Sequence, residues 1–249
     1  MFTPSLRSLW PAAVLAGIAS IAPQPGQAAT TTETRGVPEF TAIAAQGAIS
    51  LNISQGPVAS VQVTADDKVL PLIETVVEAG RRGPTLLIRY RREGSGWGRA
   101  WGNNSYNTGP IKVVIVTPRL TGLASSGSGD IRVEALNTPT LQLSLSGSGN
   151  ALLAGLNTDE LGISIAGSGD VRADGRGAKL SVAIAGSGDV RLADLRSDEV
   201  TVKIAGSGDA AVQAQKTLNV SIAGSGDVLY TGEATVKSSV AGSGTVRKH

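Results

Sequence analysis

From residue 121 onward, apolar and polar residues alternate in a pattern that returns every 18 to 20 residues. Each return is marked by a tetrapeptide that first stands at Gly127-Ser128-Gly129-Asp130. Its first glycine recurs at six later positions: Gly147, Gly167, Gly186, Gly206, Gly224 and Gly242. Asn150 and Thr245 replace the aspartate in two of the copies. A fixed period near 20 residues is typical of a solenoid built from stacked repeats.

Aliphatic residues occupy every second position on both sides of this motif. Two positions before the first glycine, the aligned repeats carry Ser125, Leu145, Ile165, Ile184, Ile204, Ile222 and Val240. Four positions after it, they carry Ile131, Ala151, Val171, Val190, Ala210, Val228 and Val246. This alternation places the columns on one face of a strand, and each repeat is too short to contain a crossover helix. We therefore predict an all-β fold, a parallel β-helix with coils of about 20 residues, right-handed by the crossover rule.

The preceding portion, residues 38–120, also alternates like β-strands but lacks the motif. Residues 66–80 predict one short helix, with Asp66 or Asp67 as its N-cap and Gly80 at its end. Residues 29–37 are rich in threonine, and we expect them to form a flexible lead-in. The β-rich portion is predicted to run without a break into the repeats at 121–249.

Residues 1–28 are typical of a secretory signal peptide. Arg7 supplies the positive charge, and the apolar run 9–21 is too short to span a membrane. Cleavage is expected after Ala28; cleavage after Ala29 and an uncleaved anchor are the alternatives. We therefore expect an exported protein, periplasmic or on the outer surface or secreted, with no transmembrane segment in the mature chain.

Composition narrows the chemistry that the chain can perform. It contains no cysteine, and its one histidine is His249, the last residue, so no Ser-His-Asp triad is possible and a zinc enzyme is not expected. A formal net charge of +2 gives no reason to expect nucleic acid as a partner. No cofactor is expected either. Aromatic residues make up only 3% of the chain, so the core must consist of Val, Ile, Leu and Ala.

The repeated aspartates admit several interpretations. Stacked coils would bring Asp170, Asp189, Asp209 and Asp227 into one row, where like charges repel unless they are compensated. A calcium ladder is one possible compensation, but this motif lacks the spacing of the calcium-binding β-roll. We favour pairing with the arginine two positions further on and hydrogen bonds from turn N–H groups. The serines of the motif would then form a hydroxyl ladder. Residues repeated in every coil lack the singular site that an enzyme needs, so no catalytic residue is assigned.

Residues 91–110 differ in chemistry from the repeats. They hold a group of aromatic and basic side chains that are candidates for partner contact: Trp97, Arg99, Trp101 and Tyr106. Exposed aromatic rings beside arginine can bind sugars, anionic polymers or proteins. The alternative is a long hairpin insertion whose tryptophans fold back onto the scaffold.

An ordered series of segments resembles one known family. Besides the Gly-Ser-Gly-Asp copies, it comprises Phe40-Thr41-Ala42-Ile43, Ile49-Ser50-Leu51, the segment from Asp66 to Glu74, Val116-Thr117-Pro118-Arg119-Leu120 and Asp227-Val228-Leu229-Tyr230-Thr231-Gly232. Over about residues 38–248 the chain is similar to the putative auto-transporter adhesin head GIN domain family. The resemblance implies a secreted β-helix without an established active site, so it assigns no functional residues; the segment 91–110 looks like an insertion relative to the family.

Together these observations predict a non-enzymatic, extracytoplasmic β-helix that acts as a binding, adhesin-like or structural surface module. A glycan or a cell-surface protein is the expected partner. The alternative is a calcium-binding or polysaccharide-acting β-helix.

Overall fold

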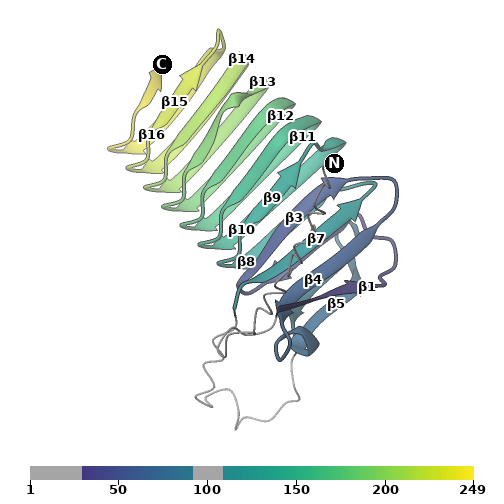
Figure 1. Cartoon of the computed structure of the whole chain (residues 1–249). Coiled ribbons are helices and arrows are strands. Elements are labelled where there is room, and N and C mark those ends of the chain that lie inside the picture. Colours follow the sequence, from purple (N-terminus) through teal and green to yellow (C-terminus); the bar gives the residue numbers. More distant parts are fainter. Residues whose placement is uncertain (1–29, 92–108) are drawn as a thin grey trace, which may run out of the picture.

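The computed structural model describes residues 30–91 and 109–249, which form one elongated β-structure (Figure 1). The predicted signal peptide, residues 1–28, lies outside the described residues. All 17 described strands belong to one hydrogen-bonded sheet that winds around the molecule. The prediction of an all-β parallel solenoid is therefore confirmed.

None of the helical structure in the described ranges is long and apolar enough to cross a membrane.

The repeats form the solenoid, with like strands stacked in parallel on those of the next coil. Five strands make up most of its length: β10 (Asn137–Gly147), β11 (Ala151–Gly167), β12 (Val171–Gly186), β13 (Val190–Gly206) and β14 (Ala210–Gly224). Each strand after β10 runs from one Gly-Ser-Gly corner to the next and bends on the way. Equivalent residues pair directly, as Leu145 does with Ile165 and Ile165 with Ile184.

The aliphatic columns fill the interior. From Leu145 to Ile222, the residues two positions before the corner glycine are at most 2% exposed. Each such side chain contributes about 1.5–3 kcal/mol when it is fully buried. The few interior side chains of one coil together contribute less than the conformational entropy cost of ordering its roughly 20 residues. Stacking is therefore obligatory, because a coil buries its interior only against its neighbours.

The polar segment between the two main strands of a coil is part of the ladder. Asn137 pairs with Asn157, and Arg176 pairs with Arg196, so these residues form a short third side of the coil and are not free turns. The hydroxyl of Thr138 is buried and donates to the carbonyl of Leu120 at 2.9 Å, which explains how a polar residue is accommodated inside.

Both glycines of each corner are required, for different reasons. The first has a positive φ, for example 137° at Gly186, which disfavours any side chain. The second, such as Gly188, has ordinary dihedrals, but a Cβ there would overlap the carbonyl oxygen of Gly169 in the preceding coil. The corner backbones thus lie directly on one another.

Corner register is held by the backbone. The N–H of Ser187 donates to the carbonyl of Gly167 at 2.9 Å, and the other corners repeat this bond. The serine side chains are exposed, and the described residues contain no hydrogen bond between their hydroxyls. The predicted hydroxyl ladder is therefore wrong, because the close glycine contacts already place backbone groups within bonding distance.

Two further coils from the N-terminal portion continue the stack. Their strands are β2 (Ala42–Gln46), β3 (Ile49–Gln55), β6 (Gly83–Tyr90) and β7 (Ile111–Thr117), and the repeats begin with β8 (Gly122–Gly127) and β9 (Ile131–Glu134). β2 lies between β6 and β8, and β3 lies between β7 and β9. The order of coils in space thus differs from their order in the chain.

Antiparallel strands close the N-terminal end. β4 (Ser60–Asp66) pairs with β7, and β1 (Thr30–Arg35) pairs with β4. The lead-in at 29–37, which was expected to be flexible, therefore contains a strand. Local composition does not reveal this strand because its register comes from an edge supplied by residues 60–66.

The predicted helix at 66–80 is also corrected. Only Leu70–Leu72 forms a single 3₁₀ turn, and Ile73–Gly80 is β5, which pairs antiparallel with β6. Asp66 begins the turn, as its Oδ1 accepts a hydrogen bond from the N–H of Lys68 at 2.8 Å. The exposed edge of β6 offers a ladder partner, and this pairing prevails over the local helical pattern.

At the other end the solenoid finishes with β15 (Val228–Thr231), β16 (Thr235–Gly242) and β17 (Val246–Lys248). Most residues of β16 are exposed, including Ser238 and Val240 at positions that face the interior in earlier coils. Lys237 places a charge on β16 and Lys248 on β17, which disfavours pairing of these edge strands with a further strand.

We expect Gly188→Ala to lower the Tm by roughly 5–10 °C, because its Cβ would push two coils apart. Gly177→Ala is the matched control. Gly177 has no positive φ, and its Cβ would meet side chains at 3.5 Å or more, so this change should leave the Tm unchanged or raise it slightly. Thermal unfolding followed by circular dichroism measures both; equal losses would contradict the role of corner contacts.

Candidate functional site

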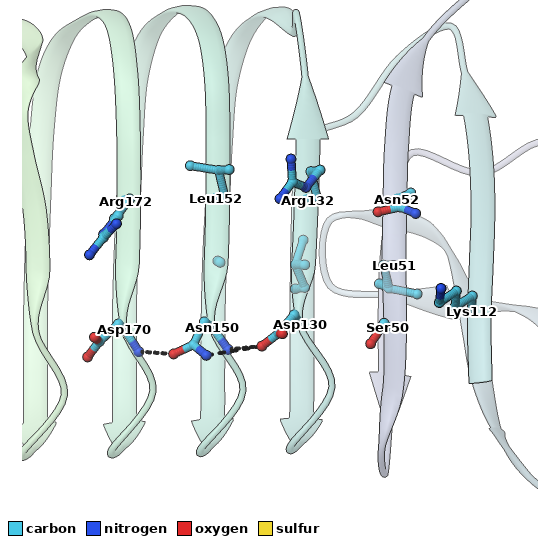
Figure 2. A pocket seen from close by; sticks show the side chains of 12 residues that line it. Ser50, Leu51, Asn52, Lys112, Asp130, Arg132, Asn150, Leu152, Asp170 and Arg172 are labelled. Atoms are coloured by element: carbon cyan, nitrogen blue, oxygen red, sulfur yellow. Dashed lines mark hydrogen bonds between the residues drawn. The ribbon is translucent and has the colours of Figure 1, made fainter. Parts of the chain in front are cut away.

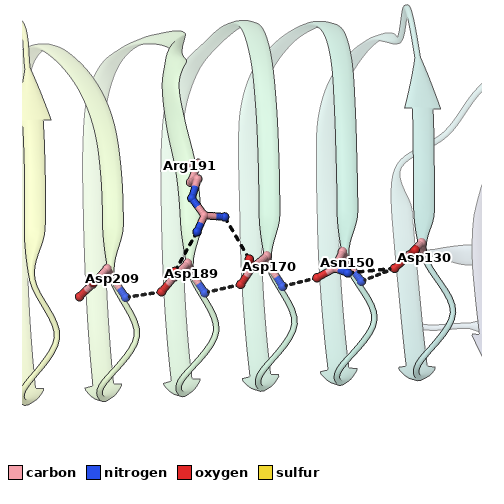
Figure 3. Close-up of polar contacts among 6 residues, drawn as sticks. All are labelled: Asp130, Asn150, Asp170, Asp189, Arg191 and Asp209. Atoms are coloured by element: carbon pink, nitrogen blue, oxygen red, sulfur yellow. Dashed lines mark hydrogen bonds and ion pairs between the residues drawn. The ribbon is translucent and has the colours of Figure 1, made fainter.

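The aspartates of the motif form a continuous hydrogen-bonded ladder along the corner (Figure 3). The Oδ1 of each accepts the backbone N–H of its counterpart one coil further on: Asp170 from Asp189 at 3.0 Å, Asp189 from Asp209 at 3.0 Å, and Asp209 from Asp227 at 2.7 Å. Asn150 takes the same place through its amide oxygen. The prediction that N–H groups compensate the acidic row is confirmed.

Arginines neutralise part of the row. Arg191 bridges two coils, because its guanidinium donates to Asp170 Oδ2 and to Asp189 Oδ2, both at 3.0 Å. Arg247 contacts Asp227 at 3.3 Å. Arg132 and Arg172, which hold the equivalent position, form no ion pair with any residue in the described ranges. The predicted pairing thus holds for two of the four arginines.

These contacts affect ionisation. Partial burial by itself raises the pKa of Asp170, but the N–H of Asp189 and the guanidinium of Arg191 together bring that pKa below its ordinary value. The hydroxyl and N–H of Thr245 likewise lower the pKa of Asp227. Both carboxylates therefore stay charged under physiological conditions.

The ladder leaves little for a calcium ion to bind. In each of the four candidates, Asp170, Asp189, Asp209 and Asp227, Oδ1 already accepts a backbone N–H of the next coil. Residues 30–91 and 109–249 contain no group of three or more His, Cys, Asp or Glu side chains arranged to hold a metal ion. At Asp170 and Asp189, a calcium ion would also have to displace Arg191 or bind the two carboxylates together with it.

The aromatic candidates Trp97, Arg99, Trp101 and Tyr106 lie outside the described residues. The structure does show where their segment is attached. β2 and β3 are joined by Gly47 and Ala48 alone, whereas the equivalent strands β6 and β7 are joined by residues 91–110. The insertion therefore replaces a tight corner and leaves the solenoid on the same edge as the Gly-Ser-Gly motifs.

A polar recess of about 590 Å³ lies on the outer face of the sheet that follows the corners (Figure 2). It extends over β7, β3, β9 and the first parts of β11 and β12. Its polar lining consists of Ser50, Asn52, Lys112, Asp130, Arg132, Asn150, Asp170 and Arg172. This site was not predicted from the sequence, because it combines the repeats with strands whose stacking order the sequence does not reveal.

One signal in the sequence did point to this place. The second repeat is one of the two that lack the aspartate, since it carries Asn150, and Leu152 stands where its neighbours carry Arg132 and Arg172. Asn150 and Leu152 both line the recess.

Residues 39–234 match the family model described as putative auto-transporter adhesin, head GIN domain. The chain belongs to this family. The resemblance seen in the sequence is thus confirmed over most of the chain, and the matched range includes residues 91–110. No curated protein matches the chain.

Solved structures share the fold of this GIN domain. A putative adhesin from Bacteroides fragilis NCTC 9343 is 22% identical, with a TM-score of 0.73 over 90% of this chain and 98% of that one. A putative lipid binding protein from Parabacteroides distasonis ATCC 8503 is 25% identical, with a TM-score of 0.69 over 88% and 96%. A putative adhesin from the same strain is 22% identical, with a TM-score of 0.65 over 90% and 98%.

The ladder predicts a difference between two substitutions at one position. Asp189→Ala removes the acceptor for the N–H of Asp209 and a partner of Arg191, so it should lower the free energy of unfolding by about 1–2 kcal/mol. Asp189→Asn keeps the oxygen acceptor, as Asn150 does, and should cost about half of that or less. Urea unfolding compares the two; equal costs would mean that the acceptor contributes nothing.

Acid should weaken the solenoid through the same carboxylates. Because the pKa values of Asp170 and Asp227 are lower in the folded state, their stabilisation is complete above the unfolded value of about 3.9 and is lost as the pH falls below it. The Tm should stay level from about pH 7 to 5 and fall below about pH 4. Asp170→Asn with Asp227→Asn should flatten this fall; an unchanged profile in the double variant would contradict the assignment.

Proposed function

We propose that this GIN domain is a non-enzymatic, adhesin-like binding module that acts outside the cytoplasm. The family description and the solved relatives described as adhesins support this role, since adhesion requires an extracellular or surface position. The predicted signal peptide at 1–28 agrees with export but lies outside the described residues.

The observation that carries the proposal is the long outer face that follows the corners. Backbone stacking holds its strands rigidly, and most of its charges are either hydrogen-bonded or paired within the row. Such a surface is preorganised, so binding of a partner does not carry the entropy cost of ordering it. The repeated residues converge on no singular catalytic group, which favours binding over turnover.

The insertion at 91–110 would add specificity to this face. Its C-terminal end leads directly into β7, and Lys112 of β7 lines the recess. Trp97, Arg99, Trp101 and Tyr106, which lie outside the described residues, would contribute to the contact surface, since aromatic rings and guanidinium groups can stack on sugars or on a protein partner.

The test is binding of the mature chain, residues 29–249, to a glycan array and to intact bacterial and epithelial cells. Trp97→Ala with Trp101→Ala should leave the Tm unchanged and weaken binding about tenfold or more. The matched control is Val58→Ala, which removes an exposed apolar residue away from this segment and should have no effect. Absence of wild-type binding to every glycan and cell would overturn the proposed function. Full binding by the double variant would remove the insertion from the contact surface.

The alternative, a calcium-binding or polysaccharide-acting protein, makes different predictions. Because the ladder oxygens already accept N–H groups, millimolar calcium should leave the Tm within about 1 °C of the value in chelator. Polysaccharides incubated with the protein should keep their chain length. A calcium shift of several degrees, or depolymerisation that is lost in Asp→Asn variants, would favour the alternative.

A further inference from the structure

The recess is the part of the outer face where the acidic row of the repeats lacks one of its negative charges. Further along the row, Arg191 is saturated by Asp170 and Asp189. In the recess, Asn150 removes one carboxylate from the ladder while its amide oxygen preserves the hydrogen bond to the N–H of Asp170 at 3.0 Å. The geometry of the ladder is thus kept, and a negative charge is missing.

Three cations remain available in the recess. Lys112, Arg132 and Arg172 are exposed, and none of them pairs with a carboxylate of the described residues. Of the two lining acids, Asp170 is already bound by Arg191, and Asp130 accepts the N–H and the side-chain amide of Asn150 through Oδ1. Positive charge therefore exceeds free negative charge in the recess.

The available groups form rows across the stacked strands. Arg132, Leu152 and Arg172 are paired in register, so the Cα atoms of the two arginines are two strand spacings, about 9.6 Å, apart. The aliphatic side chain of Leu152 lies on the strand between them (Figure 2). Asn52 pairs with Arg132 on the other side, and Ser50 pairs with Lys112. Cations at regular intervals with amide and hydroxyl donors between them fit a ligand that carries regularly spaced negative charges.

We propose that this recess binds an anionic polysaccharide, with Lys112, Arg132 and Arg172 contacting its carboxylate or sulfate groups. Asn52, Asn150 and Ser50 would bond to sugar hydroxyls, and Leu152 would contact the apolar face of a ring. The proposal rests on the proposed binding function and names its ligand class. The recess is open and extended rather than enclosed, which suits a linear chain.

Isothermal titration of the mature chain, residues 29–249, with polygalacturonate, dextran sulfate and neutral dextran of similar length tests the proposal. Both acidic polymers should bind, neutral dextran should not, and binding should weaken strongly between about 0.05 and 0.5 M NaCl. Arg132→Gln with Arg172→Gln should weaken binding about 5- to 10-fold with the Tm unchanged. The matched control, Lys203→Gln with Lys237→Gln, removes the same charge from strands β13 and β16, outside the recess, and should bind as the wild type does.

Asn150→Asp provides a second variant that retains the fold. Aspartate already occupies this ladder position in other coils, so the hydrogen bond to the N–H of Asp170 is kept while a negative charge enters the recess. We expect weaker binding by about 3-fold or more. Equal losses in the Lys203/Lys237 control, or unchanged binding in both recess variants, would overturn the site. If no acidic polymer binds the wild type but cells or other glycans do, the ligand class is wrong and the proposed function stands.

Discussion

The structure depends on backbone-to-backbone contact between successive coils at the glycine corners. Corner N–H groups donate to carbonyls of the coil before, and a Cβ on either glycine would prevent this approach or the required dihedrals. The aliphatic interior supplies most of the free energy, but it is tolerant of exchange among Val, Ile, Leu and Ala. The corners are not tolerant, since any side chain there would separate two coils.

This close stacking brings together the negative charges of the aspartates that follow the corner glycines, and neighbouring groups compensate them. It brings the aspartates into a row at the strand spacing, where their charges repel. The N–H of the following coil, together with Arg191 and Arg247, compensates most of the row and gives the outer face a fixed charge pattern. The charge pattern can be changed by small exceptions, because Asn at position 150 removes a negative charge and keeps the hydrogen bond from the N–H of Asp170.

The N-terminal portion combines two tasks. Its coils extend the solenoid, and the antiparallel strands β1, β4 and β5 cover edges that would otherwise be open to pairing. Its strands also bring Lys112, Ser50 and Asn52 beside the first repeats, which completes the recess. Residues 91–110 connect β6 to β7 at the edge where β2 and β3 are joined by a tight corner, and the stack continues on both sides of this connection.

The sequence by itself determined the repeat, the interior columns and the need for glycine at the corners, because period and alternation directly reflect strand geometry and register. It also indicated the compensated acidic row and the family. The tertiary structure alone decided that β2 and β3 lie between β6–β7 and β8–β9, that residues 73–80 form a strand, and that 30–35 pair with β4. These outcomes depend on edges supplied by distant segments, which local patterns do not encode. The recess belongs partly to the same class, since Lys112 lies on β7, and only this stacking order brings β7 near the repeats that carry Arg132 and Arg172.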